Sequence, residues 1–406
     1  MNKKLLGYRA FGLFFTIFRV FPVNRNKAFL IATHDCGPEG NIALAARAIQ
    51  KRRPNMRFVR MTKNDKVSNP FSFFVVKAFH MATSGIILLD NTFMPMAFTP
   101  VSKKTKVIQL WHGTGTIKKF GMDSDVEEVA GIAGMGNRRL TWLTVNGPRT
   151  KKQYATAFGV SPDRIRMTGL PRTDLMLDEA TLKLKKRAFF ERYRSRIGEP
   201  EKHRYVLYAP TFRDEALATG KPQLMLDIRR LLQELPEDVI LMLRFHPAVA
   251  KQFSESYFRK EISGAQRARV FDVSGYDGVA TLLSVADVLV TDYSSIVFEY
   301  AVLKRPMIFY AYDLECFREN GRNFYESYED FVPGPVVKEE EGLIRELKQA
   351  LASDDMPENG CSDRIETFLA ENFRRIDGHA SDRVAALALG IKKREFGNPK
   401  RKSRQD

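Results

Sequence analysis

Two short apolar runs of the sequence each lead into a histidine and a cation. Residues 107–111 precede His112, which is followed by Gly113, Thr114, Gly115, Thr116 and Lys118. Residues 241–243 precede Arg244, Phe245 and His246. An imidazole titrates near neutral pH and can accept or donate a proton, and glycines let a ligand approach the backbone. A single histidine after a strand is more often structural, but the two segments together predict acid–base chemistry on a bound ligand.

Two further segments indicate where phosphate would bind. Residues 288–291 precede Asp292, Ser294 and Ser295, and a predicted helix then begins. Hydroxyls and free amides at a helix N-terminus bind phosphate, although Ser-Ser is most often only a cap. Glu299 lies one turn beyond Ser295 on the same face, where its carboxylate could reach sugar hydroxyls of the ligand. Residues 205–209 precede Pro210, Thr211 and Arg213, which adds another cation after a strand.

These segments need strands to hold them, and the rest of the sequence predicts α/β layers. Short apolar runs alternate with amphipathic helical patterns, which is typical of parallel sheets covered by helices. We predict strands at residues 28–33, 57–61, 86–90, 106–111, 141–145, 205–209, 239–244, 270–273, 288–291 and 306–310. We predict helices at residues 3–22, 42–53, 71–83, 224–235, 279–285, 296–303, 341–351 and 365–375.

The order of these elements predicts two doubly wound, Rossmann-like domains. The first spans residues 28–177 and the second residues 205–391, and the charged helical stretch 178–204 is the predicted linker. Ligands of such sheets bind beyond the carboxyl ends of the strands. Two facing domains therefore place a central cleft where the four segments meet.

The positive charge of the chain is concentrated at its ends. The 406 residues carry 65 Lys and Arg against 48 Asp and Glu, a net charge of +17. Residues 1–27 contain six basic side chains and no acid, and residues 392–406 contain seven basic groups against two acids. No nucleic-acid recognition module is evident, so an anionic membrane surface rather than nucleic acid is the predicted partner. The three cysteines form no CxxC motif, which argues against a disulfide scaffold or zinc site and fits a reducing cytoplasm.

The predicted first helix, residues 3–22, is basic and mostly apolar. Its uninterrupted apolar stretch, residues 10–18, is shorter than the ~20 residues that span a bilayer. The helix either binds in the plane of a membrane, packs on the protein's own core, or is a secretory signal, for which no A-x-A-like site follows. We favour membrane binding, with the basic tail 392–406 adding attraction to anionic lipid.

The motifs taken together resemble the CDP-glycerol glycerophosphotransferases of teichoic acid synthesis. The resemblance covers roughly residues 28–390 and departs from the family pattern at Glu299, where Asp is usual, and at Gly115, where Pro is common. The chain also resembles the short, primase-type members. The matching motifs are His112-Gly-Thr with Lys118, Pro210-Thr-Phe-Arg213, Arg244-Phe-His246-Pro, Thr291-Asp-Tyr-Ser-Ser295 with Phe298-Glu299, and two minor ones, Gly169-Leu-Pro-Arg172-Thr-Asp174 and Asp377-Gly378-His379-Ala-Ser381.

The resemblance implies a GT-B-like fold that binds the acceptor in the first domain and a CDP-alcohol in the second. The acceptor hydroxyl attacks the phosphorus that carries glycerol, and CMP leaves. His112 is the expected general base, and His246 is expected to hydrogen-bond the departing phosphate or to act as an acid. Phosphoryl transfer needs positioning and charge stabilisation, and the expected donors to the pyrophosphate are Arg172, Arg213, Arg244, Ser294 and Ser295. We expect no metal or cofactor.

The expected acceptor is an undecaprenyl-linked glycan or a growing polyol-phosphate chain, which would place the enzyme peripherally on the cytoplasmic face of the membrane. A CDP-ribitol transferase and a GT-B sugar-nucleotide glycosyltransferase remain alternatives. The sequence does not decide between glycerol and ribitol, between one unit and many, or the oligomeric state.

Overall fold

The computed structural model describes residues 3–65, 69–124, 127–211, 213, 224–250, 262, 264–320, 323–352 and 361–391. The basic tail 392–406 lies outside the described residues, so the part that we predict for it in membrane binding stays a prediction.

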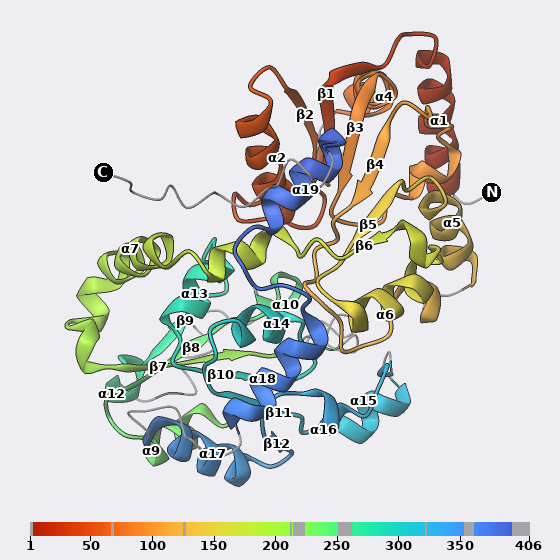
Figure 1. Cartoon of the computed structure of the whole chain (residues 1–406). Coiled ribbons are helices and arrows are strands. Elements are labelled where there is room, and N and C mark those ends of the chain that lie inside the picture. The colour runs from red at the N-terminus through yellow and green to blue at the C-terminus, as the bar shows by residue number, and fades with distance from the viewer. Residues whose placement is uncertain are drawn as a thin grey trace, which may run out of the picture.

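Two six-stranded parallel sheets form the two halves of the molecule (Figure 1). The first has the order β2-β1-β3-β4-β5-β6 and the second the order β12-β11-β10-β7-β8-β9. All ten predicted strands are present, and the two-residue edge strands β6 and β12 are additional. The strands are β1 (Asn24–Ile31), β2 (Arg57–Met61), β3 (Ser84–Leu89), β4 (Lys106–Gln109), β5 (Trp142–Thr144), β6 (Ile165–Arg166), β7 (Arg204–Ala209), β8 (Val239–Leu243), β9 (Val270–Asp272), β10 (Val288–Thr291), β11 (Met307–Tyr310) and β12 (Val336–Val337).

Helices cover both faces of the first sheet, because successive strand residues point to opposite faces. Phe29 and Ile31 of β1 pack with α1, η1, α4 and α6, whereas Ala28 and Leu30 pack with α2 and α19. The helical segments of this half are α1 (Lys3–Phe18), α2 (Asn41–Arg52), the π-helical η1 (Ser72–Lys77), α4 (Ala78–Ala82), η2 (Met94–Phe98), η3 (Gly121–Asp123), α5 (Glu127–Asn137), α6 (Pro148–Phe158), η4 (Pro162–Arg164) and η5 (Pro171–Met176).

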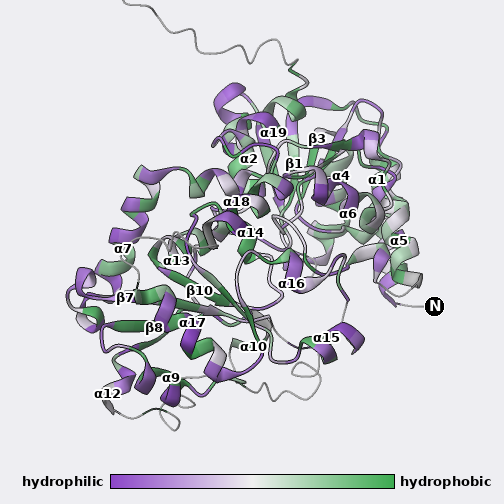
Figure 2. Ribbon diagram, turned by 60° about the horizontal axis from the view of Figure 1, so that its bottom comes forward, coloured by the Kyte–Doolittle hydropathy of each residue, from purple (hydrophilic) through white to green (hydrophobic). Residues whose placement is uncertain are grey.

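The second sheet is layered in the same way, and Figure 2 shows its strands β7, β8 and β10 as mainly hydrophobic. Leu207 of β7 packs with α7, α13, α14 and α18 on one face, and Val206 packs with α9 and α17 on the other. The helical segments here are α7 (Glu179–Ile197), η6 (Pro200–Lys202), α9 (Ile228–Glu234), α10 (Pro247–Ala250), α12 (Gly264–Arg267), α13 (Val279–Val285), α14 (Ile296–Ala301), α15 (Leu314–Asn320), α16 (Tyr328–Phe331), α17 (Glu340–Ala352) and α18 (Cys361–Asn372). The last helix of the chain is α19 (Ala380–Leu389).

The last helix returns to the first half of the molecule. Val384, Ala385 and Ala388 of α19 are buried against α2 and the first sheet, and Figure 1 shows α19 beside α2. The predicted boundary of the second domain at residue 391 is therefore wrong for residues 380–389, which complete the core of the first domain. No local pattern in the sequence distinguishes which sheet an amphipathic helix covers.

The predicted linker 178–204 is mostly the helix α7. Leu182, Phe189 and Ile197 of α7 are buried in the core of the second sheet. Most of this segment is therefore an element of the second half, and most of its charged residues are exposed.

Helix α1 packs one face on the first domain. Phe11 and Phe15 are buried in the core beside Phe73. A Cβ on Gly12 would lie 2.5 Å from the carbonyl oxygen of Phe98, so glycine lets α1 approach η2 closely. The helix ends at Phe18, four residues before the predicted end. Among the described helices, none combines the length and apolar character needed to cross a bilayer.

Candidate active site

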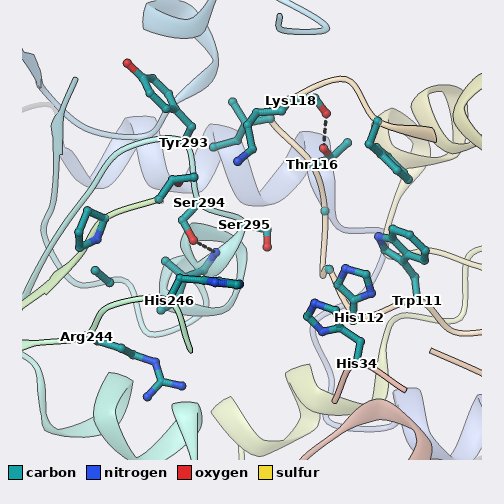
Figure 3. Close-up of a pocket in the computed structure, with 18 of the residues that line it drawn as sticks. His34, Trp111, His112, Thr116, Lys118, Arg244, His246, Tyr293, Ser294 and Ser295 are labelled. Atoms are coloured by element: carbon teal, nitrogen blue, oxygen red, sulfur yellow. Dashed lines mark hydrogen bonds between the residues drawn. The ribbon is translucent and has the colours of Figure 1, made fainter. Parts of the chain in front are cut away.

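The cleft between the two domains contains two neighbouring pockets, and both are lined by His34 and Arg244. The larger, of about 540 Å³, we call the serine pocket; it is lined by residues that include His112, Lys118, His246, Ser294 and Ser295 (Figure 3). The smaller, of about 320 Å³, we call the acidic pocket; its lining includes Asp35, Glu39, Asp277 and Glu299.

The His112 ring is oriented by a hydrogen bond to the backbone. Its Nδ1 lies 2.9 Å from the carbonyl oxygen of Asp90. A carbonyl only accepts, so Nδ1 carries the proton and Nε2 is left as the acceptor. Burial, followed by the charges of His34 and Arg172, lowers the pKa of His112 to about 3. The free site therefore holds a neutral imidazole whose Nε2 carries no proton.

The backbone before His112 is held in an unusual conformation. Trp111 has a φ of 59°, in the left-handed region that non-glycine residues rarely adopt. Asn41 donates to the carbonyl of Trp111 at 3.0 Å, and Gln109 accepts from its amide at 2.9 Å. Arg172 donates to the carbonyl of His112 at 2.9 Å. These bonds stabilise the turn that directs His112 into the serine pocket.

The opposite wall of the serine pocket comes from the second domain. The guanidinium of Arg244 donates to the backbone carbonyls of Val273 and Tyr276, at 3.4 and 3.3 Å. Burial, with the charges of His34, Lys118 and Arg244, lowers the pKa of His246. The hydroxyl of Thr211, which lines this pocket, is buried without a described hydrogen-bond partner. Ser295 precedes α14 and makes no side-chain capping bond. This wall therefore presents a cation, an imidazole and hydroxyls to the cavity.

The segment that carries Lys118 is joined to the second domain. The amide of Lys119 donates to the carbonyl of Asn323 at 3.0 Å. The amide of Tyr325 donates to the carbonyl of Ile117 at 3.4 Å. A Cβ on Gly115 would lie 2.2 Å from the ring of Phe298. A proline here, which is common in the resembled family, would overlap with this ring of the second domain. Glycine at position 115 therefore fits the close approach of Phe298.

Glu299 of the second domain and Arg172 of the first form an ion pair in the lining of the acidic pocket. Glu299 is 6% exposed and accepts hydrogen bonds from Thr114 and, at 3.4 Å, from Arg172. Arg172 also pairs with Asp35. Burial raises the pKa of Glu299, and Arg172 opposes this shift. Arg172 and Glu299 line the acidic pocket and not the serine pocket.

Arg213 lies behind the serine pocket rather than in its lining. Its guanidinium pairs with Asp292 at 2.9 Å and with Asp313 at 2.6 Å. Asp292, only 1% exposed, also accepts from the amide of Thr211 at 2.8 Å. This network therefore positions the Pro210–Thr211 turn, and the predicted contact of Arg213 with pyrophosphate stays a prediction.

Most of the predicted site residues meet at the serine pocket. Thr114, Arg213 and Asp292 are not in its lining. The serine pocket is lined by His112, Gly113, Gly115, Thr116, Lys118, Pro210, Thr211, Arg244, Phe245, His246, Ser294 and Ser295. Sequence reasoning missed Asp90 and Asn41, which hold the His112 turn. His34, which lines the same pocket, was not among the predicted site residues. The sequence signal for Asp90 was its position at the end of a fully apolar strand.

The profile of the CDP-glycerol:poly(glycerophosphate) glycerophosphotransferase family matches residues 13–389. The chain is 32% identical over 389 residues to the teichoic acid poly(ribitol-phosphate) polymerase of Bacillus spizizenii, covering 93% of this chain and 58% of that protein. It is 33% identical over 294 residues to the teichoic acid glycerol-phosphate transferase of Staphylococcus aureus, covering 70% of this chain and 71% of that protein.

A solved structure shows the same fold. The structure of the wall teichoic acid polymerase TagF matches with a TM-score of 0.76 and 23% identity, over 95% of each chain. This likeness confirms the predicted pair of facing doubly wound domains. The family profile confirms the resemblance that the motifs carry, and we conclude that the chain belongs to the CDP-glycerol:poly(glycerophosphate) glycerophosphotransferase family.

Proposed function

We propose that this protein transfers glycerol phosphate from CDP-glycerol to a hydroxyl of a lipid-linked glycan or a growing polyol-phosphate chain and releases CMP. The observation that carries the proposal is His112 with a free Nε2, facing Arg244, His246 and two serines across one pocket. A base on one wall and phosphate-binding groups on the other are what in-line phosphoryl transfer requires.

In the proposed reaction, His112 Nε2 removes the proton of the acceptor hydroxyl. The hydroxyl oxygen attacks the phosphorus that bears glycerol, and the bond from this phosphorus to the bridging oxygen breaks. CMP leaves with the electron pair of that bond. Arg244, Lys118 and the hydroxyls of the serine pocket neutralise the charge that develops on the phosphoryl oxygens, and His246 donates a hydrogen bond to the departing phosphate.

The acidic pocket suits the nucleoside of the donor. Carboxylates accept hydrogen bonds from ribose hydroxyls and from the amino group of cytosine, and Asp277 and Glu299 line this pocket beside Tyr276. With the nucleoside bound there, the pyrophosphate would lie in the serine pocket beside Arg244, which lines both pockets. The same carboxylates would repel phosphate, which favours this orientation of the donor.

The experiment must identify the polyol of the donor, because the relatives are named both as ribitol-phosphate and as glycerol-phosphate enzymes. CMP release from CDP-glycerol and from CDP-ribitol should be measured with and without a lipid-linked disaccharide. We expect acceptor-dependent release from CDP-glycerol. Faster release from CDP-ribitol would reassign the donor, and transfer from a sugar nucleotide in a radiolabelled donor panel would overturn the reaction class.

Replacing Ser294 and Ser295 together with alanine should weaken CDP-glycerol binding. Each hydroxyl lines the serine pocket, and a hydrogen bond to a charged group contributes about 1.5–3 kcal/mol. We expect an increase in Kd on the order of tenfold or more, measured by calorimetric titration. Ser327→Ala, on the loop before α16, is the matched control. An unchanged affinity in the double variant would show that the hydroxyls do not bind the donor.

We also propose that the outer face of α1 attaches the enzyme to the membrane. Leu13, Ile17 and Val20 are 62%, 52% and 81% exposed, and Phe21 follows them. The basic residues Lys3, Lys4, Arg9 and Arg19 on the same helix and turn are exposed as well. Exposed apolar side chains flanked by cations are typical of segments that lie in a bilayer interface, and a lipid-linked acceptor would need the cleft close to that interface.

Replacing Leu13, Ile17 and Phe21 with serine should release the protein from anionic vesicles. Deletion of residues 1–22 is a poorer test, because it removes Phe11 and Phe15 from the core. In vesicle co-sedimentation, we expect the triple variant to pellet less than the wild type at both low and high salt, since salt screens only the electrostatic part of binding. Leu184→Ser, at a 69% exposed position on α7, is the control. Equal pelleting of the triple variant and wild type would refute attachment through α1.

A further inference from the structure

His34 lies outside the motifs that define the family resemblance, yet it contacts the proposed base directly. The two imidazole rings lie face to face, with centroids 3.6 Å apart and planes inclined by 8° (Figure 3). We propose that His34 is a positioning residue for His112 and holds its ring in the plane from which Nε2 receives the acceptor proton. This inference rests on the proposed function and adds a residue to it.

A single residue fixes the relative position of the two rings. The carboxylate of Asp90 accepts hydrogen bonds from the backbone amides of Thr33 and Asp35, each at 2.9 Å, and from that of His34 at 3.2 Å. The carbonyl of the same Asp90 accepts the bond from His112 Nδ1. Asp90 is fully buried, so one rigid residue anchors both the loop that carries His34 and the ring of His112. Support of this kind holds a reacting group in its productive geometry.

The stacked arrangement requires that the two rings are not both charged, because two imidazolium ions at this distance would repel each other. Around His34, burial followed by the charges of Arg172 and Lys63 lowers its pKa, against the opposite effect of Asp90 and Asp35. Around His112, burial, His34 and Arg172 lower the pKa, against the effect of the bond to Asp90. Both rings are therefore neutral at neutral pH, which is the state that a base needs.

A purely structural role for His34 is disfavoured by its place in the fold. The residue is partly accessible to solvent, and it lines both pockets. The loop around it is held through backbone bonds to Asp90, which a side-chain substitution leaves intact. Variants at position 34 should therefore fold, and their effects should fall on the chemistry of His112.

The test compares His34→Ala, which removes the ring, with His34→Phe, which keeps a flat ring but no titratable nitrogen. We expect His34→Ala to lower kcat by on the order of 10- to 100-fold with little change in KM for CDP-glycerol, and His34→Phe to recover most of this loss. His379→Ala, at a ring that is 68% exposed, is the matched control. Equal kcat in His34→Ala and the wild type would overturn the proposal, and equal loss in both variants would mean that a His34 nitrogen itself takes part in the reaction.

The pH dependence gives a second readout. Removing His34 uncovers one face of the His112 ring, so the pKa of His112 should rise towards its ordinary value of 6.5. The acid limb of kcat/KM should therefore move to higher pH in His34→Ala and less so in His34→Phe. An acid limb that stays in place in His34→Ala would contradict the positioning role.

An NMR titration separates this proposal from the proposed function. The chain has six histidines, so the ring resonances of a histidine-labelled protein can be assigned from single substitutions. We expect the His112 resonances to titrate at higher pH in His34→Ala than in the wild type. If the wild type turned over neither CDP-glycerol nor CDP-ribitol, the proposed function would fail, and an unchanged His112 titration would independently overturn the role of His34.

Discussion

Replacing His112 with alanine should lower the turnover of CDP-glycerol by a factor on the order of 10²–10⁴, because this is the usual contribution of a positioned acid–base group. The Nδ1 bond to Asp90 leaves Nε2 as the acceptor atom, and alanine removes it. Donor binding should persist, since the groups that line the opposite wall are untouched. Steady-state CMP release and calorimetric titration with CDP-glycerol measure the two effects separately.

His112→Asn is the informative companion variant. An asparagine amide can still donate to the carbonyl of Asp90, so it preserves the turn after Trp111 without supplying a base. We expect it to be as inactive as His112→Ala while its thermal stability stays close to that of the wild type. Near-normal turnover in either variant, with the protein folded, would show that another group accepts the proton.

Replacing His246 with alanine should also remove most transfer, with a loss on the order of 10²–10⁴ in kcat. His246 lines the serine pocket beside the serines, where it can donate a hydrogen bond to the phosphate that leaves with CMP. Initial rates at saturating CDP-glycerol and acceptor measure this loss.

His246→Gln distinguishes the two roles that this imidazole can have. Glutamine donates a hydrogen bond but cannot transfer a proton, so a hydrogen-bonding role predicts partial recovery and an acid role predicts none. Because CMP leaves as a phosphate that needs little protonation, we expect partial recovery in glutamine. His203→Gln, far from the cleft and bonded to the backbone of Ile197 and Asp238, is the control for histidine loss. Full activity of His246→Ala would remove this residue from the mechanism.

The sequence predicted the strands, and the meeting of several predicted site residues at one pocket, because both depend on local patterns. Fully buried strands such as β3 and β8 read as continuous apolar runs, and parallel sheets bring residues after such runs to one edge. His112, Arg244, His246 and the two serines could therefore be placed together without a structure.

What the sequence could not predict depends on contacts between distant segments. Arg172 and Arg213 look like phosphate ligands in their motifs, but each is paired with carboxylates that lie far away in the chain. The stack of His34 on His112 joins two loops 78 positions apart, and no periodicity marks it. Likewise, the burial of Phe11 and Phe15 depends on Gly12 meeting η2, which no helical pattern specifies.

The return of α19 to the first domain has a consequence for how the protein matures during synthesis. Domains usually fold in order as they leave the ribosome. Here the strand face formed by Ala28, Leu30, Ile86 and Leu88 is completed by Val384 and Ala388, which are translated after the whole second sheet. The half that is made first is thus the last to be completed. Until α19 is made, α2 alone of the described helices covers this face, and the apolar residues that α19 covers stay exposed, as do the surfaces that chaperones bind.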